Sequence, residues 1–388
     1  MNVVFVNENT LGHSSYLLPF VKQLREHPEL GVTPHLIHAT PLPDHLAKRA
    51  NFSIRGLRKW GLDFHNARWR MTVSRFVRDQ LQPMTASGDV DAVVVNTQSV
   101  ALALEEIAAD VPIFLALDAT FHQLSNSRWF APNFGSRIFL PLTAATLRMR
   151  ERNIMKAARG LFPWSEEVRE SLICDYGCSP GRICLLPPSI DRRHSNRGER
   201  APNVRPRILF MGGDFRRKGG PLLLECYRRW FCGSCDLHLV TESPIEREPG
   251  VYVHNGIKPF TAAWYDLWNM ADVFVFPSTL DTFGIVLLEA LAFEVPVIAA
   301  EVGAARFVLG GGEAGWLLRD RTPECLADAL RSTLRDREAT NECILNGRDR
   351  VREFFDLSTN AAKLAEVLRA SVSLGAFDRV TQIATHPS

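Results

Sequence analysis

Short, mostly apolar segments alternate with longer segments of helical period along the whole chain. The apolar segments lie at 3–6, 93–96, 113–117, 160–163 and 183–186 in the first half, and at 208–211, 237–240, 251–253, 273–276 and 296–300 in the second. Strands that are apolar on both faces and separated by helices are typical of βαβ units with a buried parallel sheet. The alternation therefore predicts an α/β fold made of two Rossmann-like halves.

A polar segment divides the two halves. Residues 191–206 are rich in Arg, Asn, Pro and Gly and contain hardly any aliphatic side chain, as is typical of a linker. A chain of 388 residues is also long for a single hydrophobic core. We therefore expect an N-terminal domain at 1–190, a C-terminal domain at 207–370 that ends in a helix at about 357–374, and a loosely held tail at 371–388.

Composition excludes several classes of protein. The net charge of +2 argues against a chain dominated by polyanion binding, and no RNA-recognition motif is present, so no nucleic-acid partner is expected. No apolar run reaches the length of a membrane span. The first residues are interpreted as a buried strand and not as a signal peptide, which predicts a cytoplasmic protein.

Cysteine spacing argues against a zinc site. Among the eight cysteines, Cys232 and Cys235 form the only close pair with metal-like spacing, and a second such pair is missing. We expect reduced, mostly buried thiols, and a redox role for Cys232 and Cys235 is the alternative. No Asp-x-Asp pair follows a strand to hold a divalent ion, so no metal is expected.

Two carboxylates flank a Gly-opened, helix-forming segment directly after the apolar strand 273–276. The strand ends in a Pro-Ser turn, which places Asp281 in the strand-to-helix loop and Glu289 on the second turn of the following helix. Their Cα atoms are then separated by roughly 12 Å. The free amides at the helix start, from Thr282 through Phe283 and Gly284 to Ile285, suit a diphosphate, so that one acid can hold a sugar and the other a ribose.

A glycine-rich, basic turn follows the strand 208–211. It reads Gly212-Gly213-Asp214-Phe215-Arg216-Arg217-Lys218-Gly219-Gly220. Together with the segment 277–292 this turn resembles the retaining glycosyltransferases of family 4, whose motif of two glutamates eight positions apart is matched here with Asp281 in place of the first Glu. The resemblance also covers 251–256, 295–299 and 303–306, and spans roughly 205–365 in the right order.

The resemblance implies a GT-B fold, in which two Rossmann-like domains with parallel sheets face a cleft. In this family the last helix of the chain commonly crosses back to the first domain. It implies retaining, metal-independent transfer of a hexose from a UDP- or GDP-sugar to a hydroxyl of a glycan, lipid-linked or small-molecule acceptor, in polysaccharide or glycoconjugate biosynthesis, without a further cofactor. The implied catalytic residues are Asp118, Lys218 and Asp281. The implied donor-binding residues are Gly12, Gly213, Arg216, Arg217, Lys218, Gly256, Asp281, Thr282, Phe283, Gly284, Ile285 and Glu289.

Individual roles follow from the same resemblance. Lys218 and Arg216 or Arg217 would meet the charge that builds on the leaving diphosphate, while Asp281 would contact hydroxyls of the donor sugar and Glu289 those of the ribose. A solvated basic turn is the alternative for the cations, and an N-cap of the following helix is the alternative for Asp281. A nucleotide-sugar epimerase or hydrolase of GT-B form, or a glycan-binding scaffold without catalysis, remain as alternative functions.

The first domain has fewer signals. The loop after the first strand contains Gly12 but lacks G-x-G-x-x-G, which argues against a nicotinamide dinucleotide, and His13 is interpreted as a surface loop residue. Asp118 follows the strand 113–117, where relatives place a catalytic pair, and either Asp118 or His122 would act near the reacting carbon. Ser165 is interpreted as an N-cap or as part of the family's helix-opening turn.

Two basic segments are candidates for anionic partners. Region 48–78 combines nine Lys and Arg residues with interleaved aromatic side chains, which suits an anionic lipid headgroup or a lipid-linked acceptor. A second basic run contains Arg148, Arg150, Arg152, Lys156 and Arg159. Solvated helix faces are the alternative for both segments, so peripheral membrane contact stays open.

Overall fold

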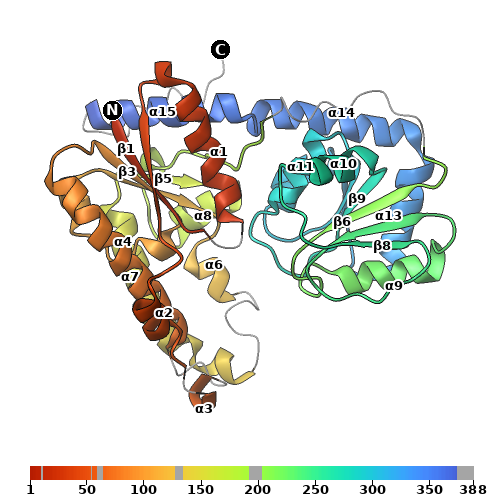
Figure 1. Ribbon diagram of the computed structural model, residues 1–388, viewed down its shortest axis with the longest axis horizontal. Coiled ribbons are helices and arrows are strands. Elements are labelled where there is room, and N and C mark those ends of the chain that lie inside the picture. The colour runs from red at the N-terminus through yellow and green to blue at the C-terminus, as the bar shows by residue number, and fades with distance from the viewer. Residues whose placement is uncertain (10–11, 54, 59–63, 127–133, 192–202, 374–388) are drawn as a thin grey trace. The chain divides into compact units, whose positions relative to one another are not determined.

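The computed structural model describes residues 1–9, 12–53, 55–58, 64–126, 134–191 and 203–373 (Figure 1). The chain divides into two compact units. Unit 1 contains Met1–Pro188 and helix α15 (Leu357–Ser373), and unit 2 contains Ser189–Asp356. Helix α15 is therefore in unit 1, whereas the predicted domain ranges placed most of it in the second domain. Most of the predicted linker and tail lies outside the described residues.

Unit 1 is built on a parallel sheet in the order β2-β1-β3-β4-β5. The strands are β1 (Asn2–Asn7), β2 (Thr33–His38), β3 (Ala92–Asn96), β4 (Ile113–Leu117) and β5 (Gly160–Pro163). Strands β3, β4 and β5 are buried along their whole length, which is why the sequence shows them as continuous apolar segments. The strand order reverses between β1 and β3, so the carboxyl ends of these two strands are the expected ligand site of this unit.

Helices cover the sheet of unit 1. Helix α1 (His13–Glu26) packs on β1 and β2 and against α15, while α4 (His65–Ala86) and α7 (Phe134–Ala157) contribute to another core cluster with Val4 and Val6 (Figure 1). The shorter elements are η1 (Pro28–Leu30), α2 (Asp44–Asn51), α3 (Arg55–Arg58), η2 (Gln98–Val100), α5 (Ile107–Asp110), α6 (Phe121–Asn126), α8 (Glu166–Cys174) and η3 (Pro180–Arg182).

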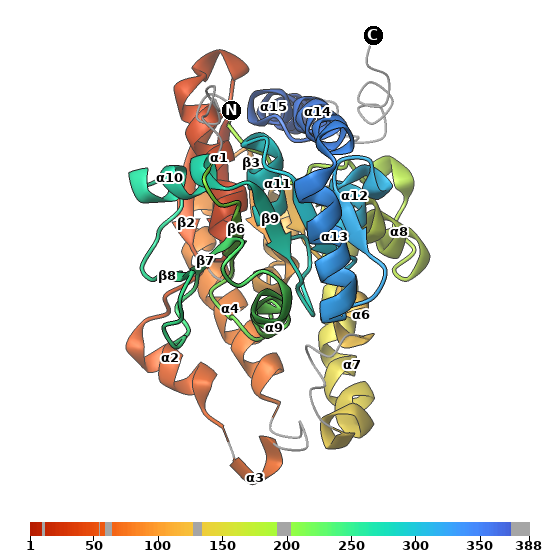
Figure 2. The same ribbon diagram turned by 90° about the vertical axis from the view of Figure 1, so that its right-hand side faces the viewer.

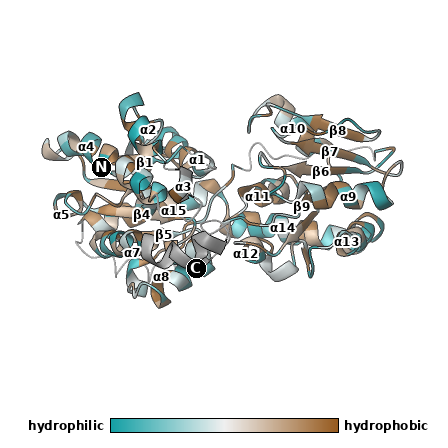
Figure 3. Ribbon diagram, turned by 90° about the horizontal axis from the view of Figure 1, so that it is seen from below, coloured by the Kyte–Doolittle hydropathy of each residue, from teal (hydrophilic) through white to brown (hydrophobic). Residues whose placement is uncertain are grey.

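Unit 2 has a parallel sheet in the order β11-β10-β9-β6-β7-β8. The strands are β6 (Arg207–Met211), β7 (Asp236–Val240), β8 (Val251–His254), β9 (Val273–Phe276), β10 (Val297–Ala300) and β11 (Trp316–Leu318). This is the Rossmann order, and it reverses between β6 and β9. In Figure 3 the strands are predominantly hydrophobic, and hydrophilic residues gather on the helices outside them.

The helices of unit 2 lie on both faces of its sheet. Helices α9 (Gly220–Trp230) and α13 (Pro323–Arg335) pack side by side, as Figure 2 shows, and share a core cluster with β6 and β7. Helices α10 (Ala262–Met270) and α11 (Ile285–Ala292) lie on the opposite side, where α11 packs on α14 (Arg337–Phe354). Short elements α12 (Ala305–Val308) and η5 (Gly310–Gly312) complete the unit.

The predicted elements agree with the structure in most places. Nine of the ten predicted strand segments lie in strands, and α15 confirms the predicted last helix. Segment 183–186 is not a strand, because it makes only scattered bonds to β5, such as Cys184 N to Leu161 O at 2.9 Å. Strands β2 and β11 were missed. Among the described helices, none combines the length and apolarity that crossing a bilayer requires.

Candidate functional site

Two loops meet where the strand order of unit 2 reverses. The loop from Gly212 to Gly219 follows β6, and the loop from Pro277 to Gly284 follows β9, the neighbour of β6 in the sheet. Ligands of open α/β sheets bind outside the carboxyl ends of the strands at such a reversal. Both motifs singled out in the sequence therefore lie at the expected ligand position of this unit.

Hydrogen bonds join the two loops. The amide and the hydroxyl of Thr279 both donate to the carbonyl of Arg217, at 2.9 and 2.7 Å. Gly219 has a φ of +81°, and a Cβ placed there would lie 2.0 Å from the carbonyl oxygen of Pro277. Glycine is thus required both for the left-handed backbone and for the close approach of the loops.

A third loop, which follows β10, contacts the turn that contains Asp281 and Thr282. The amide of Ala304 donates to the carbonyl of Thr282 at 3.0 Å. A Cβ at Gly303 would lie 2.4 Å from that same oxygen. The turn that contains Asp281 and Thr282 is therefore held between the loops that follow β6 and β10, which restrains its backbone before any ligand binds.

Lys218 and Asp281 form an ion pair between the first two loops. Their side chains are only 17% and 12% exposed, and the Lys218 ammonium also lies 5.4 Å from the centroid of the Phe276 ring. The second carboxylate oxygen of Asp281 accepts a hydrogen bond from the amide of Thr282 at 3.0 Å. Asp281 is not the N-cap of α11, as the alternative interpretation required, because that position is occupied by Gly284 with a φ of 79°.

The two arginines of the basic turn differ in their surroundings. Arg217 pairs with Asp214 at 3.4 Å and donates to the carbonyl of Leu280 at 2.9 Å. Arg216 is exposed. Contacts within and between the loops therefore hold the cations of Lys218 and Arg217 in place, whereas the side chain of Arg216 extends into solvent.

Glu289 lies on the second turn of α11, as the sequence predicted, and Asp281 lies in the loop before it. Only 9% of Glu289 is exposed. Burial raises the pKa of its carboxyl to about 7, against a smaller lowering by a hydrogen bond from Trp264. A buried carboxyl with a pKa this close to neutrality is typical of a ligand site.

The other predicted donor-binding residues follow the ends of neighbouring strands. The carbonyl of Gly213 accepts a hydrogen bond from the Thr241 hydroxyl at 3.3 Å, and the amide of Gly256 donates to the Glu242 carboxylate at 2.9 Å. Phe283 points into the core with 2% exposure, so only its backbone can serve a ligand. Ile285 is the first residue of α11.

In unit 1 the strand reversal between β1 and β3 brings another group of polar residues together. Gly12 is the N-cap of α1 with a φ of 90°, and His13 follows it. The interpretation of His13 as a surface residue is wrong, because it is only 9% exposed. Its Nε2 lies 4.0 Å from a carboxylate oxygen of Asp118, which follows β4.

Sequence reasoning missed Glu8 and its partners. The buried carboxylate of Glu8 accepts hydrogen bonds from the hydroxyls of Thr97 and Ser99, the latter at 2.6 Å. Glu8 follows β1 directly, and Thr97 and Ser99 follow β3. Polar residues directly after two neighbouring strands were the available signal, but it required knowledge of the strand order.

The last residues of β1 and β3 contribute to the same edge. Asn7 and Asn96 are fully buried. The side-chain Nδ2 of Asn96 donates to the carbonyl of His13 at 2.9 Å. The carboxamide oxygens of both asparagines and Nδ1 of His13 have no hydrogen-bond partner among the described residues. Buried polar atoms of this kind are ready for a ligand or an ordered water.

The remaining candidates are separate from this group. His122, on α6, lies beside Asp175, with 3.6 Å between Nε2 and the carboxylate. Ser165 occupies the N-cap position of α8, although its side chain makes no capping hydrogen bond. Within the part of the chain that the structure describes, no group of three or more His, Cys, Asp or Glu side chains has the arrangement of a metal site.

Comparison with known proteins finds a family match within the second unit. Residues 254–350 match the family of glycosyl transferases group 1. A curated relative, a D-inositol 3-phosphate glycosyltransferase from Geodermatophilus obscurus, is 29% identical over 247 residues. That match covers 56% of this chain and 54% of the relative, so the chain spans about half the length of this curated protein.

Solved structures match nearly the whole chain. A sucrose-phosphate synthase from Thermosynechococcus elongatus has a TM-score of 0.70 at 17% identity and covers 96% of this chain and 100% of its own. Anabaena HepE, in complex with UDP and glucose, has a TM-score of 0.63 at 16% identity and covers 95% of this chain and 100% of its own. At these identities the likeness concerns the fold alone. The predicted GT-B class, with two parallel-sheet α/β domains, is thereby confirmed.

Proposed function

Since residues 254–350 match the family of glycosyl transferases group 1, we propose that the chain transfers a sugar from a nucleoside-diphosphate sugar to an acceptor hydroxyl. The observation that carries this proposal is the pairing of Lys218 with Asp281 at the strand reversal of unit 2, directly before α11 with its buried Glu289. A cation for phosphate, a helix start and two carboxylates for hydroxyls are the groups that such a donor requires.

In the proposed reaction the bond between the anomeric carbon and the diphosphate oxygen breaks, and a bond from that carbon to the acceptor oxygen forms. The acceptor proton leaves with the departing phosphate or through a basic side chain. Lys218 and Arg217 would stabilise the negative charge that develops on the diphosphate, together with the amides at the start of α11. Retention at the anomeric carbon is proposed from the family.

The two carboxylates would divide the hydroxyl groups of the donor. Glu289, five residues into α11, would accept hydrogen bonds from the ribose, and these bonds are strongest when its carboxyl is ionised. Asp281 would accept from the donor sugar. Lys218 neutralises Asp281 without ligand, so arrival of a diphosphate gives the ammonium a second anion and leaves more of the Asp281 carboxylate for sugar hydroxyls.

The acceptor side is proposed at the polar edge of unit 1. Asp118 with His13, 4.0 Å apart, would orient the acceptor hydroxyl or stabilise positive charge at the reacting carbon. Glu8 would position Thr97 and Ser99, which both donate to its carboxylate. Gly12, at the start of α1, would allow close approach of the donor phosphate.

Calorimetric titration with UDP, GDP, ADP and NAD tests the donor class. UDP comes first, since the HepE structure contains it. We expect tight binding of one nucleoside diphosphate, a large loss of affinity in Glu289→Ala, and no loss in Glu313→Ala, whose side chain is exposed. Binding of NAD alone, or of no nucleotide, would contradict the proposal. Turnover of the donor without an acceptor would favour the epimerase or hydrolase alternative.

We also propose that the basic region 48–78 contacts an anionic membrane surface or a lipid-linked acceptor. In the described part of this region Phe52, Leu57 and Phe64 are exposed apolar side chains, and the guanidinium of Arg68 lies 5.6 Å from the centroid of the Phe52 ring. Apolar side chains among arginines suit the lipid interface. Co-sedimentation with phosphatidylglycerol vesicles should weaken in Phe52→Ser. If this variant binds the vesicles as well as the wild type does, Phe52 has no role in membrane contact.

A further inference from the structure

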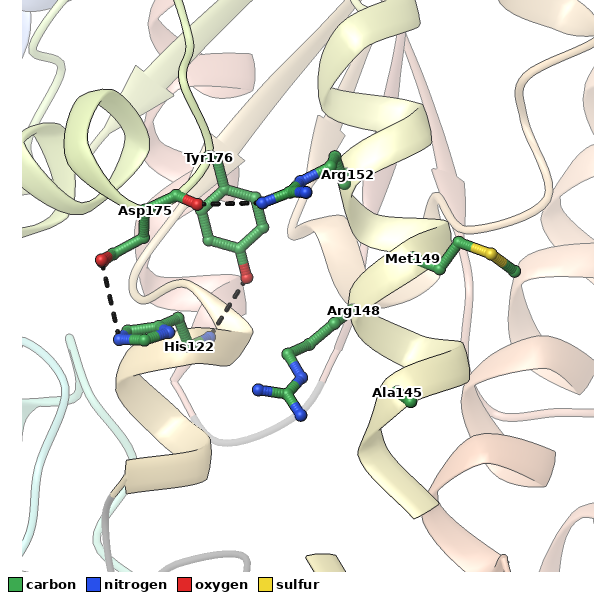
Figure 4. A pocket seen from close by; sticks show the side chains of 7 residues that line it. All are labelled: His122, Ala145, Arg148, Met149, Arg152, Asp175 and Tyr176. Atoms are coloured by element: carbon green, nitrogen blue, oxygen red, sulfur yellow. Dashed lines mark hydrogen bonds and ion pairs between the residues drawn. The ribbon is translucent and has the colours of Figure 1, made fainter. Parts of the chain in front are cut away.

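Unit 1 has a surface pocket of about 410 Å³, and none of the residues to which the proposed function gives a role lines it. Three elements form it: the short helix α6 with His122, helix α7 with Arg148 and Arg152, and the turn after α8 with Asp175 and Tyr176 (Figure 4). Its volume lies in the range of pockets for small molecules.

The side chains that line the pocket are more basic than acidic. Arg148 and Arg152 are four residues apart and thus on one face of α7, where like charges one turn apart destabilise the helix slightly. Asp175 supplies the carboxylate of the lining, and it is already engaged: one oxygen lies 3.6 Å from Nε2 of His122 and the other accepts from the Ser171 hydroxyl at 2.7 Å. Among the charged side chains that line the pocket, two are guanidinium groups and one is this carboxylate.

The side chains converge on the same space. In Figure 4 the guanidinium of Arg148 reaches from α7 toward His122 and the hydroxyl of Tyr176. Arg152 points toward the ring of Tyr176, and its guanidinium donates a hydrogen bond to the carbonyl of Asp175 at 3.2 Å. This hydrogen bond orients the Arg152 guanidinium before a ligand arrives.

A buried network fixes the floor of the pocket. The Tyr176 hydroxyl donates to the carboxylate of Glu151, which is 1% exposed, and accepts from the amide of His122 at 3.1 Å. Glu151 also accepts from the amide of Phe121 at 2.9 Å and from Gln98 at 3.0 Å. Buried hydrogen-bonded networks of this kind rigidify the residues they hold.

We propose that this pocket binds the phosphate group of a small polar molecule through Arg148, Arg152 and His122. Guanidinium groups match phosphate oxygens with paired, charge-assisted hydrogen bonds. The space exceeds what a side-chain pair needs, so the phosphate can be carried by an organic group. Its source is either a phosphorylated acceptor, which rests on the proposed function, or free phosphate, which does not.

Calorimetric titration tests the site in a Lys218→Ala background, which removes the loop cation of unit 2 as a competing phosphate binder. The probes are glucose 6-phosphate, inorganic phosphate and uncharged glucose. We expect each of Arg148→Gln and Arg152→Gln to weaken phosphate binding by about tenfold or more. The control is Arg150→Gln, which removes the same charge from the same helix. Arg150 does not line the pocket, and its guanidinium lies 3.5 Å from the carboxylate of Glu105.

The probes also separate the sources of the phosphate. Tighter binding of glucose 6-phosphate than of inorganic phosphate assigns the pocket to a phosphorylated organic ligand, and equal binding assigns it to the free ion. Carbon-13 NMR of the His122 ring, identified with His122→Gln, locates the ligand even where an arginine variant folds poorly. Binding that is the same in Arg148→Gln, Arg152→Gln and Arg150→Gln, or phosphate that leaves the His122 signal unchanged, would overturn the proposal. No measurement of sugar transfer enters this test, so its failure is distinct from failure of the proposed function.

Discussion

Lys218 and Asp281 neutralise each other in a mostly buried position, so removal of one charge leaves the other without its partner. In Lys218→Met the carboxylate of Asp281, 12% exposed, keeps its charge without its cation. We expect the free energy of unfolding to fall by about 1–3 kcal/mol, because a desolvated charge without a partner is costly. Urea denaturation measures this.

The double variant Lys218→Met/Asp281→Asn provides the control for that prediction. Removal of both charges should recover most of the lost stability, because no unpaired charge then remains. Binding of a nucleoside diphosphate should stay weak in the double variant, since the cation for the phosphate is still absent. A double variant as unstable as Lys218→Met would show that packing of the lysine stem, and not the ion pair, is what matters.

Glu289 couples stability to pH. Burial raises the pKa of its carboxyl to about 7 in the folded chain, from 4.5 for the exposed group. The folded state therefore holds the proton more tightly than the unfolded state, so the stabilisation is fully present below about pH 4.5 and is lost as pH rises toward 7. Compared with Glu289→Gln, which cannot ionise, the wild type should lose roughly 3 kcal/mol of unfolding free energy at most between pH 5 and 8.

Nucleotide binding should show the opposite dependence on pH. Ribose hydroxyls donate hydrogen bonds, so they favour the ionised form of Glu289. Affinity for the nucleoside diphosphate is expected to rise between pH 6 and 8 in the wild type and to change less in Glu289→Gln. Calorimetry in two buffers of different ionisation enthalpy measures the proton released on binding. Equal pH profiles for both proteins would mean that Glu289 does not contact the ligand in its ionised form.

At the scale of elements, the approach of the β6–α9 loop to the end of β9 depends on Gly219. Gly219→Ala would place a Cβ 2.0 Å from the Pro277 carbonyl oxygen at a φ of +81°. Gly233 has the same φ of +81°, and a Cβ there meets nothing within 4 Å. Gly233→Ala thus carries the backbone strain alone, about 1 kcal/mol, whereas Gly219→Ala adds separation of the loops.

We expect Gly219→Ala to lower the unfolding free energy by roughly 2–4 kcal/mol and to weaken nucleotide binding, because the loop that carries Lys218 must move. Thermal unfolding and titration of both variants separate the two effects. If the two alanine variants lose the same stability, the close contact with Pro277 does not restrain the loop.

The elements predicted best from the sequence are the strands that consist of a continuous run of mostly apolar residues. Strands β3, β4 and β9 are buried along their length and match the predicted segments closely. Strand β2 was missed because it contains Pro34, His35 and His38 and is only partly buried. Strand β11 has three residues, which is too short for a periodicity to be recognised.

The candidate site was predictable only where its residues are close in sequence. The loop position of Asp281 and the helical position of Glu289 followed from local pattern, but Asp281 and Lys218 are 63 residues apart and meet because β6 and β9 are neighbours. Strand order cannot be derived from the periodicity of single segments. The burial of His13 and the bonds to Glu8 in unit 1 were missed for the same reason.

At the scale of the whole molecule, α15 comes directly after the last helix of unit 2 in sequence, yet it belongs to unit 1. It packs on α1, the Lys363 ammonium donates to the carbonyl of Leu185 at 3.2 Å, and Leu364 and Leu368 are buried four residues apart on one face. Unit 1 therefore requires both ends of the described chain to complete its core.

This arrangement predicts which unit a substitution in α15 destabilises. Leu368→Ala should cost unit 1 about 2–5 kcal/mol, because the cavity it leaves lies in that core. Hydrogen exchange followed by mass spectrometry should show faster amide exchange in β1, β3 and β4 and little change in β6, β7 and β9. Leu345→Ala on α14, where the leucine is 47% exposed, should change neither set. Faster exchange confined to the strands of unit 2 in Leu368→Ala would instead mean that α15 stabilises unit 2, as the predicted range 207–370 for the second domain implied.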